Sequence, residues 1–336
     1  MAAAGYSENQ PARGIPRRTS NNAFPRMKLF LQLCLTFLLP TCLRAEERRF
    51  VFERPLMATR FAITCHGEDE SAARKAADEA FAAGEEVNRI ASDYSPESEL
   101  MRLPTGRATG VSPVFAGLLT ASFHLAETSG GTFDPTLGRL TKLWRESRRA
   151  RQLPAPGDLA KAREASGWMH ATWDATTSTI LLEKPGMQLD LGGIAKGYAA
   201  DRMLAIMVKA GFPRTCIAAG GDLRLGDPPP GKTAWRVGLQ TFDENKPEEV
   251  VELANCAVST SGDLHQFAEI DGKRYSHILD PTTGLGLTER IAVSIIASDA
   301  TTSDALATAA CVAGPKKAEA IALKAGATKV IVRTIR

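Results

Sequence analysis

Apolar residues recur along the chain with two spacings, one typical of helices and the other of strands. The Ala/Glu-rich residues 69–91 have helical spacing and predict a long amphipathic helix. The Ser-Pro pair at 112–113 is a typical helix start, and the Gly-Gly pair at 130–131 is expected to end that helix. The continuous apolar run at 291–298 is the strongest strand signal.

The same patterns predict a chain in which strand pairs and helices are segregated. Further strands are expected at 58–65, 168–173, 178–183, 214–219, 234–240, 250–260 and 328–334. Further helices are expected from the glycine segment at 189–197 to about residue 210, at 301–313 and at 315–325. The basic, then proline-containing residues 145–164 are expected to form a solvated loop and a short helix. Without strict strand–helix alternation, this order favours an α+β fold with mixed or antiparallel sheets and packed helices.

The N-terminal part of the chain has a different pattern. Residues 1–26 are polar and have no apolar period. A basic residue after Met27 precedes an apolar run at 29–39, and the small residue Ala45 follows, which is the order of a secretory signal. The run is too short for an ordinary spanning helix, which needs about 20 apolar residues. We therefore expect a targeting segment that starts at Met27.

Two regions follow from this pattern, a targeting segment at 1–45 and a single domain at 46–336. The segment carries a net charge of +5 and the whole chain +3, so the domain is slightly acidic. A slightly acidic domain argues against a nucleic-acid partner. We expect export to the periplasmic side of the bacterial inner membrane after cleavage behind Ala45. A lipid anchor at Cys42 is the alternative, and either form of the segment allows membrane association.

Segment 189–201 carries the most informative candidate chemistry. It is expected to form a short buried strand, a glycine turn and the start of a helix. Gly192 and Gly193 allow a tight turn and close approach to a ligand, and a helix start offers free N–H groups to phosphate. Asp190 enters the turn and Lys196 lies in the early helix, which suggests a phosphate-bearing ligand with a divalent metal. A Gly-Gly turn without a ligand is the alternative.

Three other polar segments have both a functional and a structural interpretation. Asp134 precedes a proline, so its carboxylate could bind a ligand or only cap the turn. His277 could act as a general base near neutral pH, or orient the Asp-Pro turn that contains Asp280. Asp304 and Thr308 share one helix face and suit a hard cation such as Mg²⁺, although an aspartate early in a helix also favours the helix dipole.

A polar turn dense in hydroxyls is expected at 259–263, after a strand. Thr302 or Ser303 is expected to cap the helix that follows.

Together and in this order, the segments resemble the ApbE-type FAD:protein FMN transferases, over roughly residues 55–334. The matching stretches are Pro-Leu-Met-Ala-Thr-Arg-Phe (55–61), Ser-Asp-Tyr-Ser (92–95), Ser-Glu-Leu (98–100), Gly-Thr-Phe-Asp-Pro-Thr (131–136), the 189–201 segment, Ala-Gly-Gly-Asp (219–222), Ser-Thr-Ser-Gly-Asp (259–263), His-Ile-Leu-Asp-Pro (277–281) and Asp-Ala-Leu-Ala-Thr (304–308). The resemblance implies an ApbE-like, T-fold-like architecture.

The resemblance also implies a reaction and a set of site residues. FMN would move from FAD to a threonine or serine hydroxyl of an acceptor protein, with release of AMP. The acceptor would be a redox protein of envelope electron transport. FAD would contact Met57, Tyr94, Thr132, Phe133, Asp134, Asp190, Lys196 and Ile278. Mg²⁺ would be held by Asp304, Thr308 and a backbone oxygen near Gly193. His277 is our candidate for the base that takes the hydroxyl proton, and Asp280 is the second.

The chain departs from the family pattern at two places. The usual Met-Gly-Thr is Met-Ala-Thr at 57–59, and an asparagine expected after the Ser-Glu stretch is replaced near Leu103 and Pro104. Two other functions use the same residues. One is an FAD pyrophosphatase that yields FMN and AMP, and the other is a non-catalytic flavin-binding protein.

Overall fold

The computed structural model describes residues 47–239, 242, 249–263 and 266–335. The chain divides after Arg44, and everything below concerns the unit Ala45–Arg336. The predictions of a targeting segment, of cleavage behind Ala45 and of a lipid anchor at Cys42 lie outside the described residues. Within the described ranges, none of the helices is both long and apolar enough to cross a membrane.

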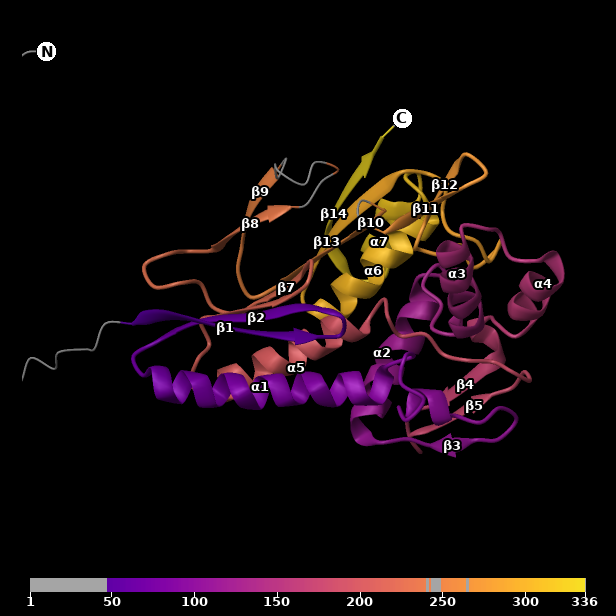
Figure 1. The fold of residues 1–336 in the computed structure, drawn as a ribbon. Helices are drawn as coiled ribbons and strands as arrows, with labels where there is room; N and C mark the ends of the chain where they lie inside the picture. The colour runs from indigo at the N-terminus through magenta and orange to yellow at the C-terminus, as the bar shows by residue number, and fades with distance from the viewer. Residues whose placement is uncertain (1–46, 240–241, 243–248, 264–265, 336) are drawn as a thin grey trace, which may run out of the picture. The chain divides into compact units, whose positions relative to one another are not determined.

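A seven-stranded antiparallel sheet is the largest element of this unit (Figure 1). Its strands, in spatial order, are β1 (Arg48–Leu56), β2 (Thr59–Gly67), β6 (Thr215–Ala219), β7 (Asp222–Leu225), β10 (Ala257–Gly262), β13 (Ile291–Ala297) and β14 (Ala327–Thr334). Every residue of β13 is buried, as its continuous apolar run predicts. The sheet confirms the expected α+β class and is antiparallel rather than mixed.

Helices pack on this sheet around the main hydrophobic core. They are α1 (Glu70–Ala91), α5 (Ala195–Lys209), α6 (Ala300–Ala313) and α7 (Ala318–Lys324), and α2 (Pro113–Thr128) packs in turn against α1 and α6. The core includes Phe61 of β2, Phe81 of α1, Met203 of α5 and Leu306 of α6. Many of its small members are alanines, which let α5 and α6 approach each other closely.

Smaller elements form around this layer. One is a three-stranded sheet of β3 (Thr109–Gly110), β5 (Thr179–Leu182) and β4 (Ala171–Asp174). Two are the helices α3 (Gly138–Ala150) and α4 (Pro156–Glu164). The others are two hairpins, β8 (Trp235–Leu239) with β9 (Glu249–Leu253) and β11 (Phe267–Ile270) with β12 (Lys273–Ser276). A second apolar cluster joins Trp144 of α3 to Tyr275 of β12, and a third joins the β8–β9 hairpin to the large sheet. Trp144 also donates its indole N–H to the Ser276 carbonyl over 3.0 Å, so α3 is fixed to the chain just before His277.

Several predicted elements differ from the structure. Of the strand expected at 168–173, Trp168–His170 form a 3-10 helix, and β4 begins only at Ala171. The loop expected from residue 145 is the second half of α3, because Leu140, Trp144 and Ser147 bury one helix face between its basic residues. The strand expected at 250–260 is two strands, interrupted at Asn255, whose φ of +52° is left-handed. Residues 189–191 are not a strand. Leu189 and Leu191 are buried and Asp190 is half-buried, but the nearest pairing is an isolated bridge between Gln188 and Leu137.

Candidate active site

A buried ion-pair cluster joins α5, α6 and β7. Lys196 of α5 places its Nζ atom 2.9 Å from Asp222 Oδ2 and 2.9 Å from Asp304 Oδ1. The backbone N–H of Gly197 donates to Asp304 Oδ2 over 3.0 Å. Both carboxylates are almost fully buried, with Asp222 4% and Asp304 3% exposed. Two carboxylates and one ammonium leave the cluster with a net negative charge.

Electrostatics inside the cluster favour a charged lysine. Burial lowers the pKa of Lys196, but the charges of Asp222 and Asp304 outweigh burial and raise it overall. Burial and the charge of Asp222 raise the pKa of Asp304 to about 6, although Lys196 opposes them. An additional cation beside Asp304 would therefore be stabilised by the excess negative charge.

Thr308 lies one turn after Asp304 on α6 and faces the glycine turn before α5. A methyl group on Gly193 would lie 3.3 Å from Thr308 Oγ1 and 3.5 Å from the ring of Phe133. Ser261 Oγ lies 3.4 Å from the same threonine hydroxyl. The structure thus places the glycine turn at Gly193 against Thr308, one helical turn from Asp304.

The polar turn expected at 259–263 is wrong, since residues 259–262 continue strand β10. Their hydroxyls have partners on neighbouring elements. Ser259 pairs with Ser303 at 2.8 Å and Thr260 with Ser294 at 2.8 Å. These bonds compensate for placing hydroxyls inside a strand.

The predicted cap of α6 is also wrong. Asp299 is the N-cap and accepts from the Thr302 N–H over 2.7 Å, whereas Ser303 turns its hydroxyl to Ser259. An aspartate just before the helix provides the side-chain acceptor that a first-turn N–H group needs.

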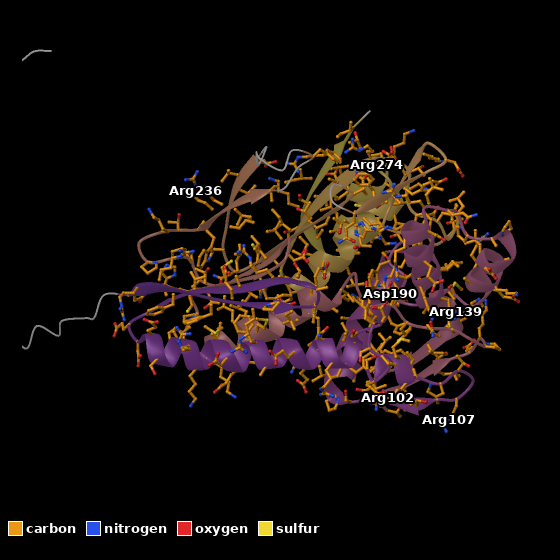
Figure 2. All side chains as sticks on the ribbon, viewed as in Figure 1. Arg102, Arg107, Arg139, Asp190, Arg236 and Arg274 are labelled. Carbon is orange, nitrogen blue, oxygen red and sulfur yellow. The ribbon has the colours of Figure 1, made fainter. Side chains whose placement is uncertain are left out.

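Asp190 organises the turn that carries Gly193. Its Oδ1 accepts from the Gly192 N–H over 2.8 Å, and its Oδ2 accepts from the Thr141 hydroxyl of α3 over 2.6 Å. The N–H of Asp190 donates to the Pro135 carbonyl over 2.8 Å. Figure 2 shows Asp190 beside α3, well away from Arg236 and Arg274. Asp190 therefore links the glycine turn, α3 and the 131–136 segment.

Asp134 is held by hydrogen bonds within the protein. It accepts from the Thr136 N–H over 2.8 Å, from the Thr136 hydroxyl over 2.6 Å and from the Trp168 N–H over 3.1 Å. Burial raises the pKa of Asp134, and these three bonds partly offset that rise. The contacts support the turn-capping interpretation, and the contact with FAD remains a prediction.

Phe133 and Thr132 lie beside Asp134 in the same segment. The Phe133 ring is 4% exposed and packs near Gly193. Thr132 donates its hydroxyl to the Ser129 carbonyl over 3.1 Å. Phe133 is therefore close to the glycine turn, whereas Thr132 is bound to the end of α2, and the contacts of both with FAD remain predictions.

Tyr94 presents an exposed aromatic ring, 73% of it accessible. Arg145 of α3 lies over this ring, with Cζ 4.2 Å from the ring centre, and forms an ion pair with Asp93. Burial and the charge of Asp190 raise the pKa of Asp93, although the bond and the charge of Arg145 oppose this. Arg145, expected in a solvated loop, instead connects Tyr94 to the surroundings of Asp190.

Met57 and Ile278 reach the core from two turns. Met57 lies in the β1–β2 turn and packs, partly buried, against the main core. Thr59 follows it and touches Gly220, two residues before Asp222 of the ion-pair cluster. Ile278 is 6% exposed and belongs to the main core. Their contacts with FAD remain predictions.

His277 is held so that one ring nitrogen is free. Its Nδ1 lies 3.1 Å from the Gln266 carbonyl, and because a carbonyl only accepts, Nδ1 carries the proton of the neutral ring. Nε2 is then the acceptor. Burial, followed by the positive charges of Arg148 and Lys196, lowers the pKa of His277 to about 4, although the Gln266 bond and Asp263 oppose this. His277 is thus neutral at physiological pH.

Asp280 shapes its own turn. Its Oδ1 accepts from the Thr282 N–H over 2.8 Å, and its carbonyl accepts from the Gly284 N–H over 2.8 Å. Among the residues that the structure describes, no hydrogen bond or ion pair joins Asp280 to Lys196 or Asp304. Its position supports the turn interpretation more directly than a role as a base.

The sequence motifs did not single out Asp222 as a site residue, although it belongs to the Ala-Gly-Gly-Asp stretch. A carboxylate that follows a Gly-Gly pair at the start of a strand was the available signal. The pairing with Lys196 was not visible, because it depends on β7 lying next to α5 in the fold.

The arrangement is that of an α+β protein in which a glycine turn, a threonine hydroxyl and a buried Lys–Asp–Asp cluster lie next to an antiparallel sheet. A model of the ApbE family matches residues 57–332, so this chain belongs to the ApbE family. The FAD:protein FMN transferase of Escherichia coli K12 is 30% identical over 249 residues, 71% of each chain. That of Salmonella typhimurium is 28% identical over 310 residues, 88% of this chain and 89% of the relative.

Solved structures of family members have the same fold. The ApbE protein of Thermotoga maritima superposes with a TM-score of 0.77 at 29% identity, covering 85% of this chain and 97% of the other. The flavinyl transferase ApbE of Pseudomonas stutzeri gives a TM-score of 0.74 at 27% identity, covering 87% and 96%. The sequence-based assignment to this family and fold class is confirmed.

The residues present fit a magnesium ion. Mg²⁺ prefers oxygen donors, and Asp304 and Thr308 offer a carboxylate and a hydroxyl beside the backbone of Gly193. The net negative charge of the Lys196 cluster favours a further cation. In the described part of the chain no three His, Cys, Asp or Glu side chains gather at a metal-binding distance, so the donor set depends on the hydroxyl and the backbone.

Proposed function

We propose that this protein transfers FMN from FAD to a threonine or serine hydroxyl of an acceptor protein in a Mg²⁺-dependent reaction that releases AMP. Its relatives from Escherichia coli and Salmonella typhimurium are named FAD:protein FMN transferases. The observation that carries the proposal is the contact of the Gly193 turn with Thr308, one helical turn from the Lys196–Asp304 ion pair. This contact combines a phosphate-binding turn with a hard-cation donor set.

Each residue of the cluster has a part in holding the pyrophosphate. Asp304, Thr308 and the Gly193 carbonyl would hold Mg²⁺, which when bound would withdraw charge from the phosphoryl oxygens and stabilise departing AMP. Lys196 keeps Asp304 ionised and orients it. Gly192 and Gly193 keep side chains away from the backbone, so a phosphate can approach closely.

Proton transfer is assigned to His277. The acceptor oxygen forms a bond to the FMN phosphorus while the bond from that phosphorus to the oxygen of AMP breaks. The hydroxyl proton passes to the free Nε2 of His277, whose other nitrogen is fixed on the Gln266 carbonyl. A low pKa keeps this nitrogen unprotonated and available at neutral pH.

We place the reaction on the periplasmic side of the inner membrane, after export by residues 1–45. The acceptor proposed there is a redox protein of electron transport. The order of basic, apolar and small residues before Ala45 supports export.

Mass spectrometry of an acceptor tests the proposal. The purified protein is incubated with FAD, MgCl₂ and a candidate acceptor, and the acceptor is denatured before measurement. We expect one covalent FMN per acceptor and one AMP released for each. FMN and AMP without an adduct would identify a pyrophosphatase, and intact FAD would identify a flavin-binding protein; either result contradicts transfer.

A matched pair of variants tests the metal ligands. Thr308→Val keeps the shape of the side chain but removes the donor hydroxyl, and we expect the rate to fall by roughly 100-fold. Thr302→Val makes the same change on the same helix, away from Gly193, and should retain the wild-type rate. Excess EDTA should reduce the wild-type rate, and added MgCl₂ should restore it.

A further inference from the structure

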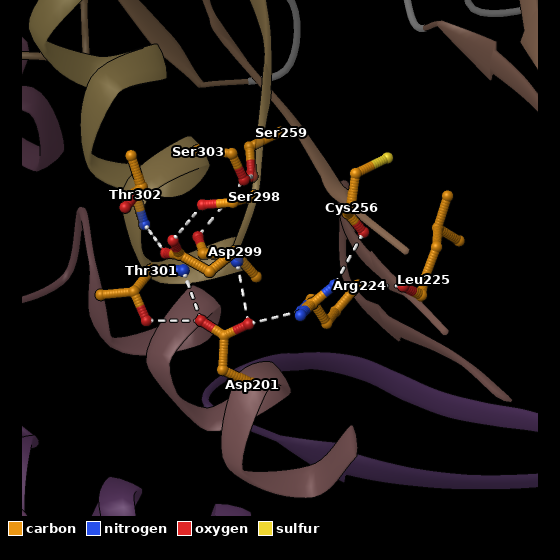
Figure 3. Close-up of polar contacts among 11 residues, drawn as sticks. Asp201, Arg224, Leu225, Cys256, Ser259, Ser298, Asp299, Thr301, Thr302 and Ser303 are labelled. Atoms are coloured by element: carbon orange, nitrogen blue, oxygen red, sulfur yellow. Dashed lines mark hydrogen bonds and ion pairs between the residues drawn. The ribbon is translucent and has the colours of Figure 1, made fainter. Parts of the chain in front are cut away.

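Asp201 of α5 binds the first turn of α6 (Figure 3). Its carboxylate accepts from the Ala300 N–H over 2.9 Å, from the Thr301 N–H over 2.8 Å and from the Thr301 hydroxyl over 2.6 Å. Arg224 of β7 donates its Nε–H to the same carboxylate over 2.7 Å. The Asp201 side chain is 21% exposed, so these four bonds replace most of its hydration.

This contact repeats the Lys196 contact with reversed charges. Lys196 joins α5 to a carboxylate of α6 and to a carboxylate of β7. Asp201, five residues further along α5, joins it to the N–H groups of α6 and to the Arg224 guanidinium of β7. The same three elements are therefore connected twice.

Between the two contacts, α5 and α6 touch through their backbones. A methyl group on Gly197 would lie 2.0 Å from the Ala300 carbonyl oxygen and 2.9 Å from Asp304 Cβ. Contacts at residues 196, 197 and 201 of α5 thus fix α6 near its start. A shift or rotation of α6 would break the Asp201 bonds first, because they bind the terminal turn.

We infer that Asp201 is a positioning residue that sets the place of the magnesium ligands Asp304 and Thr308 against Gly193. The inference rests on the proposed function. Asp201 binds residues 300 and 301 of α6, and Asp304 follows within one turn. Thr308 is one further turn along the same rigid helix, so a movement at its start is transmitted to both ligands.

Asp299 provides the contrast that separates positioning from capping. It caps α6 from within, through the Thr302 N–H, and pairs with the Ser298 hydroxyl next to it. Neither bond reaches α5 or β7. Loss of Asp299 would weaken the end of the helix without releasing the helix from Lys196 and Asp201.

Metal binding without turnover tests the inference. MgCl₂ is titrated by calorimetry into FAD-loaded protein with no acceptor, for the wild type and the variants. Asp201→Asn loses the ion pair with Arg224 and one acceptor oxygen, and we expect the Kd for Mg²⁺ to rise roughly 10- to 100-fold. Thr301→Val should have a smaller effect in the same direction, and Thr301→Ser should restore the wild-type Kd. Asp299→Ala should lower Tm with a wild-type Kd.

Rates measured with an acceptor add a second readout. At saturating MgCl₂ the Asp201→Asn variant should regain most of its kcat, whereas half-saturation should require more metal. A wild-type Kd in Asp201→Asn, or an equal rise in Asp299→Ala, would overturn the positioning role. If Asp201→Asn does not fold, the comparison of Thr301→Val with Thr301→Ser decides. Wild-type protein that fails to modify the acceptor would instead contradict the proposed function.

Discussion

At the scale of single residues, the β1–β2 turn contains a backbone conformation that glycine adopts more easily than alanine. Met57 and Ala58 have φ values of +50° and +56°, in the left-handed region. The ApbE-type pattern has glycine at the second position. A left-handed conformation costs an alanine about 1 to 2 kcal/mol, and the greater unfolded-state freedom of glycine offsets part of that cost.

We therefore predict that Ala58→Gly raises the free energy of unfolding by about 1 kcal/mol, measured by urea denaturation. The matched change Ala62→Gly, within strand β2, should lower it, because glycine weakens a strand interior. A destabilised Ala58→Gly protein would show that the turn does not strain the alanine.

His277 predicts a pH dependence for the reaction. Since its pKa is about 4, the base is neutral from about pH 5 upward, so protonation of His277 should lower kcat only as the pH approaches 4. Between about pH 6.5 and pH 4 the unfolded chain binds a proton at His277 and the folded chain does not. The contribution of His277 to the free energy of unfolding is therefore fully present above about pH 6.5 and is lost as the pH falls through 4. The rate–pH profile of the wild type, compared with His277→Gln, measures the effect. An identical profile in the variant would remove His277 from the role of base.

The sequence indicated the residues that carry chemistry better than it indicated their partners. Lys196, Asp304 and Thr308 stood out because each lies in a short motif with a physical reason for its spacing. Asp222 and Asp201 were not chosen, because their partners are distant in sequence and meet only when α5, α6 and β7 pack. In the sequence, Asp222 has the appearance of a turn residue, and nothing near it indicates that Lys196 of another element forms an ion pair with it.

At the scale of elements, the crossing of α5 and α6 depends on Gly197. Its Cα is so close to the Ala300 carbonyl that an added methyl group would lie 2.0 Å from the oxygen. We predict that Gly197→Ala lowers the free energy of unfolding by about 3 kcal/mol, since the backbones must separate. Urea denaturation measures the loss, and the Lys196–Asp304 pair should weaken with it, so transfer should also slow.

Gly157 provides the matched control for that substitution. It lies in the first turn of α4, with no neighbouring atom within 4 Å of an added methyl group. Gly157→Ala should leave stability unchanged or slightly raised, because alanine favours a helix more than glycine does. Equal effects at the two sites would show that helix propensity, rather than the crossing, determines the result.

Periodicity predicted most helices because their burial is local. The long helix expected at 69–91 is α1, and the helix expected from Pro113 is α2. It missed α3 because arginines separate its few apolar positions, and its burial depends on the distant Tyr275 and Ser276. The 189–191 segment was predicted as a strand because of its apolar residues. They are buried, but the segment does not pair with a neighbouring strand.

At the scale of the whole molecule, the sequence predicted the fold class but not the order of the strands. β2 pairs with β6, whose residues follow about 150 positions later, and β7 pairs with β10 across an intervening hairpin. Such pairings depend on how separate apolar faces fit together, and no local pattern records them. The family resemblance implied the architecture from the order of the motifs along the chain, and not from local hydrophobic patterns.

The three apolar clusters indicate where the folding unit begins. Their members start at Phe50, and Glu47 still forms an ion pair with Arg214. We therefore predict that a chain starting at residue 46 folds with the same Tm as a chain starting at Met27 and transfers FMN at the same rate in solution. Thermal unfolding and the acceptor assay measure both properties.

A shorter chain that starts at residue 57 tests the same argument from the other side. It lacks β1, so β2 loses its nine-residue ladder and becomes an exposed edge, and the core loses Phe50 and Leu56. Burying two such side chains contributes about 3 to 6 kcal/mol, a large part of the stability of an ordinary domain. This chain should unfold at a much lower temperature or aggregate. If it were as stable as the longer chain, β1 would be dispensable, and the boundary of the domain would lie after it.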